Sequence, residues 1–185
     1  SALFGQFADK FEKSLQIRRV KLFEVVIGLL ALLGFWLDNV PLLLFVLFLL
    51  GLQSTIFGPI KYGILPQILR REELVGGNAL VEMGTFVAIL AGTIAGPQLA
   101  GMVASWPYWV GVACVAVALA GYLYSLRVPQ AAPVAPELRI NWNIFSESVR
   151  NLRFINESRT VLNSVLGISW FWFFGATFLV QIPSY

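Results

Sequence analysis

Long apolar runs separated by short polar segments dominate this chain. The runs that carry almost no charge are residues 20–36, 40–65, 79–103, 108–126 and 161–182. At about 1.5 Å of rise per residue, helices of these lengths approach or exceed the roughly 30 Å hydrocarbon core of a bilayer. The pattern predicts five membrane spans, and the apolar residues 1–7 are typical of the end of a further span.

Turn-forming and capping residues separate the predicted spans. Asp38 and Asn39, followed by Pro41, predict a turn after the first whole span. Asn78 is expected to be the N-cap of the helix over 79–103, because its side-chain oxygen can accept from the unpaired amides of the first turn. A tight turn over 104–107 leads into the next span.

The composition changes after residue 126. Residues 127–136 contain three prolines without helical periodicity, which predicts a linker. Residues 141–157 place apolar side chains at spacings of three and four with charged residues between them, which predicts an amphipathic helix. Its basic polar face fits either the membrane surface or the cytoplasmic ends of the spans.

Composition places the chain in a membrane and argues against catalysis. Of the 185 residues 58% are hydrophobic and 12% are charged, and the mean hydropathy is +0.77. The sequence has no histidine, so imidazole-assisted nucleophiles, proton shuttles and histidine-ligated metals are excluded. We therefore expect no catalytic residue, metal or cofactor in this chain, and a packing role for its one cysteine, Cys114.

The basic residues predict the orientation in the membrane. Residues 8–21, 66–77 and 127–159 hold 5, 2 and 5 of them, which is 12 of the 13 in the chain. Positive charge marks cytoplasmic loops, so these three segments are expected on the cytoplasmic side. The net charge of +3 then reflects topology, and no nucleic-acid partner is expected.

Lys61 is the thirteenth basic residue, and it lies inside the span over 40–65. An ammonium within a span is costly and predicts a functional site. Glu82, one turn into the following span from the same side, is the expected partner of Lys61. In the alternative interpretation Lys61 extends to the lipid headgroups and Glu82 only caps a helix.

Residues 2–13, ALFGQFADKFEK, resemble the loop signature G-x-L-A-D-R-x-G-R-K of the major facilitator superfamily. Gly5, Ala8, Asp9, Lys10 and Lys13 match it in register, whereas Glu12 stands where the signature has its second glycine. The resemblance implies that four of these residues, Gly5, Asp9, Lys10 and Lys13, control the conformational change.

The same resemblance implies an all-α integral membrane fragment that runs from the end of the second span through the seventh. Residues 1–126 would then be part of the N-terminal six-span half, 127–159 a cytoplasmic linker with an amphipathic helix, and 160–185 the first span of the C-terminal half.

Residues 54–65 and 72–96 resemble the lysophospholipid transporter family, whose members stand alone or are fused to an acyltransferase and acyl-acyl-carrier-protein synthetase. The positions that carry this resemblance are Pro59, Lys61, Tyr62, Gly63, Ile64, Leu65, Asn78, Leu80 and Glu82. It implies inward flipping of lysophospholipids such as lysophosphatidylethanolamine across the bacterial inner membrane for reacylation. Lys61 and Glu82 would contact the headgroup, and the partners would be the lipid bilayer and an acyltransferase domain or protein.

Residues 92–101, GTIAGPQLAG, resemble the fifth-span signature of proton-coupled drug exporters, with Ala100 in place of one glycine. Gly92, Gly96, Pro97 and Gly101 are expected to permit close helix packing. A drug or small-molecule exporter of the same superfamily is therefore one alternative. The membrane module of a fused phospholipid acyltransferase is the other.

Overall fold

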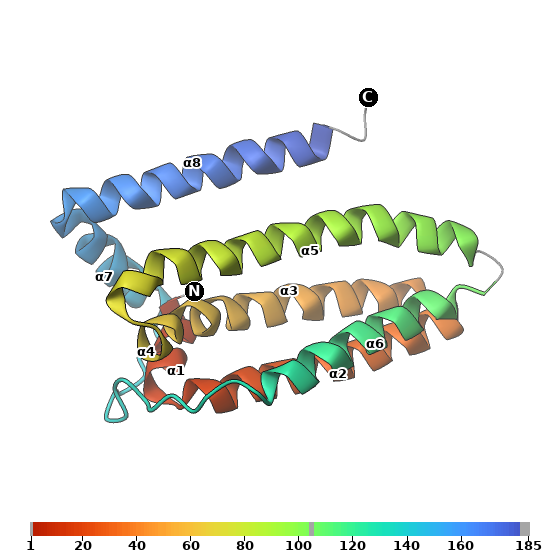
Figure 1. Ribbon diagram of the computed structural model, residues 1–185, viewed down its shortest axis with the longest axis horizontal. Coiled ribbons are helices and arrows are strands. Elements are labelled where there is room, and N and C mark those ends of the chain that lie inside the picture. The colour runs from red at the N-terminus through yellow and green to blue at the C-terminus, as the bar shows by residue number, and fades with distance from the viewer. Residues whose placement is uncertain (1, 104–105, 182–185) are drawn as a thin grey trace. The chain divides into compact units, whose positions relative to one another are not determined.

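The computed structural model describes residues 2–103 and 106–181, which form helices and the segments that connect them and contain no strand (Figure 1). The elements are α1 (Ala2–Lys10), α2 (Lys13–Trp36), α3 (Val40–Gly63), α4 (Leu65–Ile68), η1 (Arg71–Glu73), α5 (Leu74–Met102), α6 (Tyr108–Ser125), α7 (Ile144–Glu157) and α8 (Arg159–Gln181). The chain divides into two compact units, one over Leu3–Ile140 and one that begins at Asn141. The first unit holds α1 to α6, and the second holds α7 and α8.

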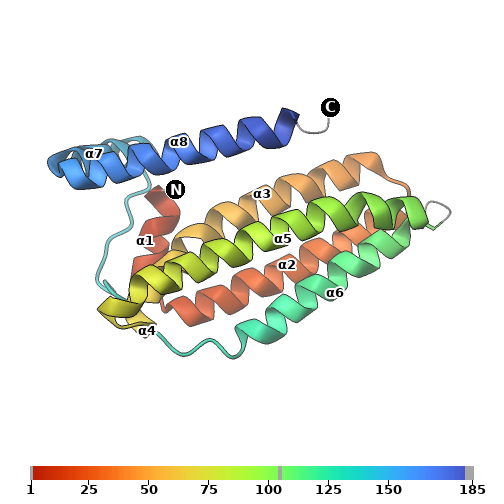
Figure 2. The ribbon, with the colours of Figure 1, turned by 45° about the horizontal axis from the view of Figure 1, so that its top comes forward.

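Close packing of α2 against α3 and α6 holds the first unit together. In Figures 1 and 2 the long helices α2, α3, α5 and α6 run alongside one another. A Cβ added to Gly111 of α6 would lie 2.5 Å from the Cα of Leu32 in α2, so the two backbones approach more closely than any side chain would allow. A Cβ added to Gly28 of α2 would lie 3.4 Å from the Cα of Val115 in α6, which is ordinary van der Waals contact. By contrast, α5 has no buried residue.

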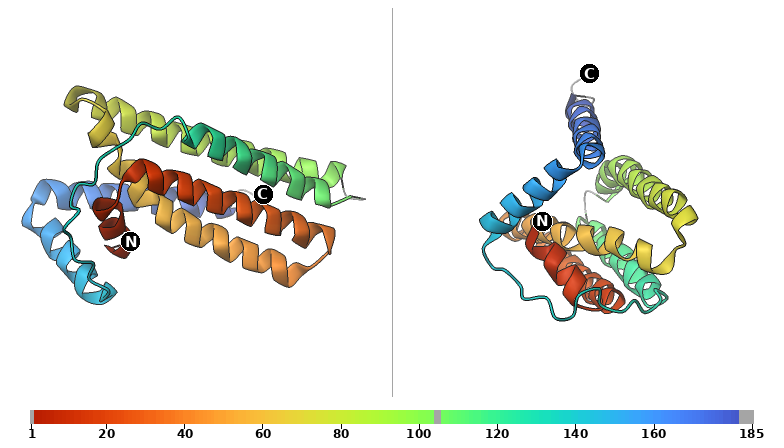
Figure 3. Two further views of the ribbon diagram at one scale, coloured as in Figure 1. Left: turned by 90° about the horizontal axis from the view of Figure 1, so that it is seen from below. Right: turned by 90° about the vertical axis from the view of Figure 1, so that its left-hand side faces the viewer.

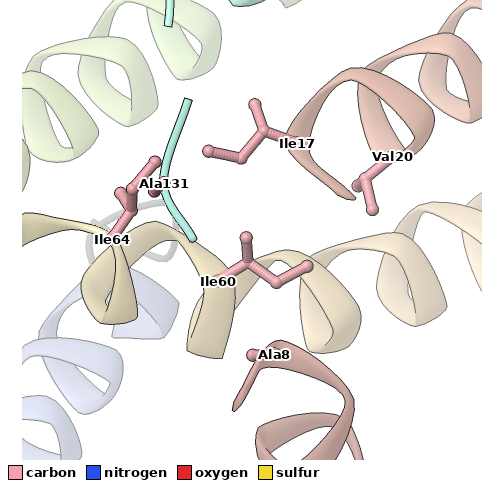
Figure 4. Close-up of a cluster of buried hydrophobic side chains, with 6 residues drawn as sticks. All are labelled: Ala8, Ile17, Val20, Ile60, Ile64 and Ala131. Atoms are coloured by element: carbon pink, nitrogen blue, oxygen red, sulfur yellow. The ribbon is translucent and has the colours of Figure 1, made fainter. Parts of the chain in front are cut away.

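Two clusters of buried apolar side chains form the core of this unit. One joins α2 to α3 through Ile27, Ala31 and Val46. The other lies where α1, α2, α3 and the linker meet. Figure 4 shows its members, Ala8, Ile17, Val20, Ile60, Ile64 and Ala131.

The predicted turn between α2 and α3 is confirmed. Asp38 has a positive φ of 50°, a conformation that aspartate tolerates better than most residues. The Asn39 side chain accepts a hydrogen bond from the Leu42 N–H at 2.9 Å, and this caps α3.

The prediction that Asn78 is an N-cap is wrong. The 3₁₀ turn η1 leads directly into α5, and the Glu73 carboxylate accepts a hydrogen bond from the Arg70 N–H at 2.9 Å. Asn78 therefore lies inside α5, where its amide donates to the Leu74 carbonyl at 2.8 Å. Segment 66–77 is consequently mostly helical.

Segment 8–21, expected to be a polar loop, is also mostly helical. Only Phe11 and Glu12 separate α1 from α2, because α2 extends well beyond the apolar run on which the prediction rested. The sequence pattern did not indicate that α2 begins at Lys13, because the first turns of this helix mix charged residues with buried ones such as Ile17.

Among the described residues, four helical stretches are long and apolar enough to cross a membrane. They are Val40–Ile68, Arg71–Met102, Tyr108–Ser125 and Arg159–Phe178. These stretches correspond to four of the five predicted spans. The span over 20–36 stays a prediction, because Arg19, Lys21 and Glu24 interrupt the first half of α2. Parts of two further predictions, residues 104–105 of the turn and residue 182 of the last span, lie outside the described residues.

The second unit confirms the predicted amphipathic helix. Asn143 caps α7 by accepting a hydrogen bond from the Ser146 N–H at 3.1 Å. Ser158 alone separates α7 from α8 and has extended backbone angles, φ −120° and ψ 113°. The chain therefore changes direction between the two helices, as Figure 3 shows.

Candidate functional site

Lys61 lies in the last turn of α3, inside the membrane-span candidate Val40–Ile68, and is half-buried. Its ammonium donates a hydrogen bond to the Thr85 hydroxyl of α5 at 3.1 Å. The Thr85 hydroxyl in turn donates to the Val81 carbonyl at 2.8 Å. The Lys61 nitrogen also lies 4.7 Å from the centre of the Tyr62 ring, within the range of a cation–π contact.

Glu82 is bound by Tyr62 and not by Lys61. The Tyr62 hydroxyl donates a hydrogen bond to the Glu82 carboxylate. The ion pairs between described residues do not include Lys61 with Glu82, so the expected pairing is not found. Lys61, Tyr62, Glu82 and Thr85 together form what we call the α3–α5 polar cluster.

This cluster leaves the ammonium of Lys61 able to take an anion. Of its three protons, one is donated to a neutral hydroxyl, which is a weaker acceptor than a phosphate or carboxylate oxygen. Glu82, the acidic side chain expected to pair with the ammonium, instead accepts a hydrogen bond from the Tyr62 hydroxyl. A positive charge within a membrane-span candidate, with its acidic neighbour bound by another residue, is chemically able to bind an anion.

A second polar cluster lies between α2 and α3 and was missed as a site. Lys21 forms an ion pair with Glu24 at 2.8 Å, and the buried amide of Gln53 donates to the same carboxylate oxygen at 2.9 Å. The Lys21 nitrogen lies 5.0 Å from the centre of the Phe57 ring. Glu24 is a charge inside a predicted span, and that signal was available in the sequence.

Glu24 is also the one charged side chain that lines an apolar groove of about 520 Å³ between α2, α3, α5 and α6. Gly92 and Gly96 line the same groove. A Cβ added to Gly92, Gly96 or Gly101 would meet no atom within 4 Å, so the close packing expected there is not found in the described part of the chain. Pro97 lies inside α5, and the expectation that it permits close helix packing stays a prediction.

Cys114 faces this groove and is exposed, so the packing role expected for its thiol is not found either. The sequence did not distinguish an exposed thiol from a packed one, because the small apolar residues beside Cys114 are compatible with either.

Two of the four residues expected to control the conformational change are brought together. Lys13 is 1% exposed and its ammonium has no hydrogen-bond partner, while the nearest Asp9 carboxylate oxygen is 3.9 Å away. Burial lowers the pKa of Lys13, and the Asp9 carboxylate opposes that shift. Lys10 instead lies beside the Phe11 ring, at 5.9 Å, and a Cβ on Gly5 would meet no neighbour within 4 Å.

The segments predicted to be cytoplasmic are joined by hydrogen bonds. Arg18 donates to the Leu126 and Val128 carbonyls at 3.4 and 3.3 Å, and Gln67 donates to the Ala132 carbonyl at 3.3 Å. The Asp9 carbonyl accepts from the Val134 and Ala135 amides at 3.1 and 2.9 Å. Within the first unit, parts of all three segments are therefore in contact with one another.

No group of three or more His, Cys, Asp or Glu residues that could hold a metal ion occurs in the part of the chain that the structure describes.

Comparisons with known proteins give sequence relatives. No family model matches the chain, and no solved structure matches it. The chain is 31% identical over 187 aligned residues to the lysophospholipid transporter LplT of Escherichia coli (strain K12 / DH10B) and of Shigella boydii serotype 18. The alignment covers 94% of this chain and 42% of those relatives, so the chain spans about two fifths of their length.

Proposed function

Because this chain is similar over nearly its whole length to the lysophospholipid transporter family, we propose that the full-length protein is a multi-pass membrane transporter that moves lysophospholipids. The observation that carries the proposal is this similarity, together with a lysine inside a membrane-span candidate whose acidic neighbour is held by another residue. Neither observation favours the drug exporter.

Within this proposal Lys61 binds the phosphate of the substrate. In the absence of substrate its ammonium donates to Thr85, a neutral acceptor. A phosphate oxygen would replace Thr85 with a charge-assisted hydrogen bond, which is about twice as strong as a neutral one. Thr85 would remain hydrogen-bonded to the Val81 carbonyl after this exchange, so its partly buried hydroxyl is not left unpaired.

Glu82 has a different role in this proposal from the one expected from the sequence. Its carboxylate would repel a phosphate if it stood free beside Lys61, whereas the hydrogen bond from Tyr62 disperses part of its charge. In this proposal Tyr62 therefore keeps the Glu82 carboxylate from competing with the substrate phosphate for Lys61.

The finer features of the transport cycle rest on the motifs and the charge distribution. We propose a transporter of the major facilitator type in the bacterial inner membrane, with segments 8–21, 66–77 and 127–159 on the cytoplasmic side. The proposed direction is inward, and the proposed substrate is lysophosphatidylethanolamine, which an acyltransferase domain or partner protein would then reacylate.

Uptake of labelled lysophosphatidylethanolamine by cells that express the full-length protein, with acyltransferase activity present, tests the proposal. We expect the label to accumulate as a diacyl phospholipid, and cells without the transporter to show only background. Resistance to cationic dyes without lipid uptake would contradict the proposal and indicate an exporter.

A further inference from the structure

Residues 128–135, part of the segment expected to be a linker, are bound to the helices of the first unit. None of these residues belongs to a helix. Ala131 is nevertheless 4% exposed and belongs to the buried apolar cluster of Figure 4, and Val128 packs beside that cluster. Backbone groups of the segment are hydrogen-bonded to α1, α2 and α4. We call residues 128–135 the strap.

The C-terminal end of the strap is anchored firmly on α1. The Val134 and Ala135 amides donate to the Asp9 carbonyl at 3.1 and 2.9 Å, which are ordinary lengths for such bonds. Pro133 and Pro136 flank this pair, and a proline has a fixed φ and no N–H. Both amides that residues 133–136 possess are therefore spent on one carbonyl of α1.

The rest of the strap is held more loosely. Arg18 of α2 donates to the Val128 carbonyl and Gln67 of α4 to the Ala132 carbonyl, each at 3.3 Å. These distances exceed the usual range of about 2.7 to 3.2 Å. Of the strap residues only Ala131 is buried. A segment with few buried contacts and exposed hydrogen bonds opens at a low free-energy cost.

A buried charge at the same junction favours opening. Lys13 is 1% exposed, its ammonium has no hydrogen-bond partner among the described residues, and the nearest Asp9 carboxylate oxygen is 3.9 Å away. Lys13 lies one turn before Ile17, which belongs to the same cluster as Ala131. An unpaired buried ammonium raises the free energy of the closed arrangement, and this cost is relieved when the ammonium reaches water or an anion.

We propose that the strap is a latch, which stays anchored on α1 and detaches from α2 and α4 during the transport cycle. Detachment withdraws Ala131 from the cluster and gives the ammonium of Lys13 access to water. The inference goes beyond the proposed function and rests on it in one respect, because it ties the detachment to transport.

A reversible cross-link between the strap and α4 tests the latch in the full-length protein. Gln67 and Ala132 are both exposed and are replaced by cysteine, in a background where Cys114 and any further cysteine of the full-length chain are serine. A short bis-methanethiosulfonate reagent links the two thiols through disulfides that dithiothreitol cleaves. We expect the link to form in most molecules, to lower lysophosphatidylethanolamine uptake roughly tenfold or more, and to be reversed by dithiothreitol.

Asn151→Cys/Phe154→Cys is the matched control, because it places the same link within one helix, α7. Uptake by this variant should be the same before and after linking. Undiminished uptake by molecules linked between positions 67 and 132 would overturn the proposal. A pair that does not link would overturn it as well, since a closed strap holds the two positions together.

Spin labels on the same two cysteines distinguish a failure of the latch from a failure of the proposed function, because they require no transport. Labels on a closed strap broaden each other's spectra, whereas labels on a detached strap do not. In nanodiscs we expect both components, in a proportion that lysophosphatidylethanolamine changes. A broadened component alone, with and without this lipid, would overturn the latch. Both components in a protein without uptake would support the latch and contradict the proposed function.

Discussion

The hydroxyl of Tyr62 in α3 donates a hydrogen bond to the carboxylate of Glu82 in α5, so that the residue next to Lys61 binds the acid that Lys61 was expected to bind. Two adjacent side chains of α3 therefore bind different polar residues of α5: Tyr62 binds Glu82, and Lys61 binds Thr85. Among the described residues, Lys61 and Glu82 therefore each have a neutral partner and form no ion pair with one another.

Replacement of Lys61 by alanine is expected to reduce lysophospholipid uptake by roughly tenfold to a hundredfold. A hydrogen bond to a charged group contributes about 1.5 to 3 kcal/mol, and each 1.4 kcal/mol is a factor of ten. Uptake per inserted molecule is the measurement. Lys61→Arg should retain part of the activity because the charge remains, and Arg71→Ala should behave as wild type. Undiminished uptake by Lys61→Ala would remove the headgroup role.

Replacement of Tyr62 by phenylalanine is expected to lower uptake several-fold, because a freed Glu82 carboxylate can then pair with Lys61. Glu82→Gln in the same chain should restore much of the loss, since an amide is a weaker competitor for the ammonium. A double-mutant cycle over the two positions measures this coupling. Additive effects of Tyr62→Phe and Glu82→Gln would show that Tyr62 does not act through Glu82.

Lys13→Met is expected to maintain or raise thermal stability while it reduces transport. The buried ammonium has no hydrogen-bond partner, so an apolar side chain of similar length removes a desolvation cost. The reduction in transport would come from losing the contact with Asp9. Lys10→Met is the control for the stability measurement, since the Lys10 side chain is only partly buried.

The stability of the wild type should also depend on pH through Lys13. Burial lowers the pKa of Lys13 in the folded state, so the unfolded chain binds more protons over the interval between the lowered and the ordinary lysine value. Stability therefore rises as the pH rises through that interval. Thermal midpoints in detergent at increasing alkaline pH measure this rise, and the Lys13→Met variant should show a smaller one.

Gly111→Ala is expected to destabilise the protein by about 1 to 3 kcal/mol, because the new Cβ would meet the backbone of Leu32 at 2.5 Å and the helices must separate. Gly92→Ala is the matched control on α5, where a Cβ meets no atom within 4 Å. Thermal midpoints of the two variants are compared with wild type. An equal loss at both positions would contradict the packing described for α2 and α6.

Much of the fold follows from hydrophobic runs, and most of the site does not. Four of the five predicted spans and the amphipathic helix were predictable because apolar length and periodicity are local properties of a sequence. The turn at Asp38 and Asn39 was predictable from its residue types. Helix starts were less predictable, since α5 begins before Asn78 through a hydrogen bond between Arg70 and Glu73.

The partners of intramembrane charges were not predictable, because they depend on how neighbouring helices are rotated. Lys61 was recognisable as a site from its position in a span, yet its acceptor Thr85 carries no signal of its own in the sequence. Glu24 and Gln53 show the same limit, since 28 residues separate two side chains that share one hydrogen bond.

The carbonyl of Asp9 accepts hydrogen bonds from both Val134 and Ala135, so one oxygen atom at the end of α1 fastens the linker. Any displacement of α1 that preserves these two bonds draws residues 134–135 along with it. The end of α1 and the linker are thus tethered through the backbone, without any side chain taking part, and substitution of the Asp9 carboxylate alone would leave this tether in place.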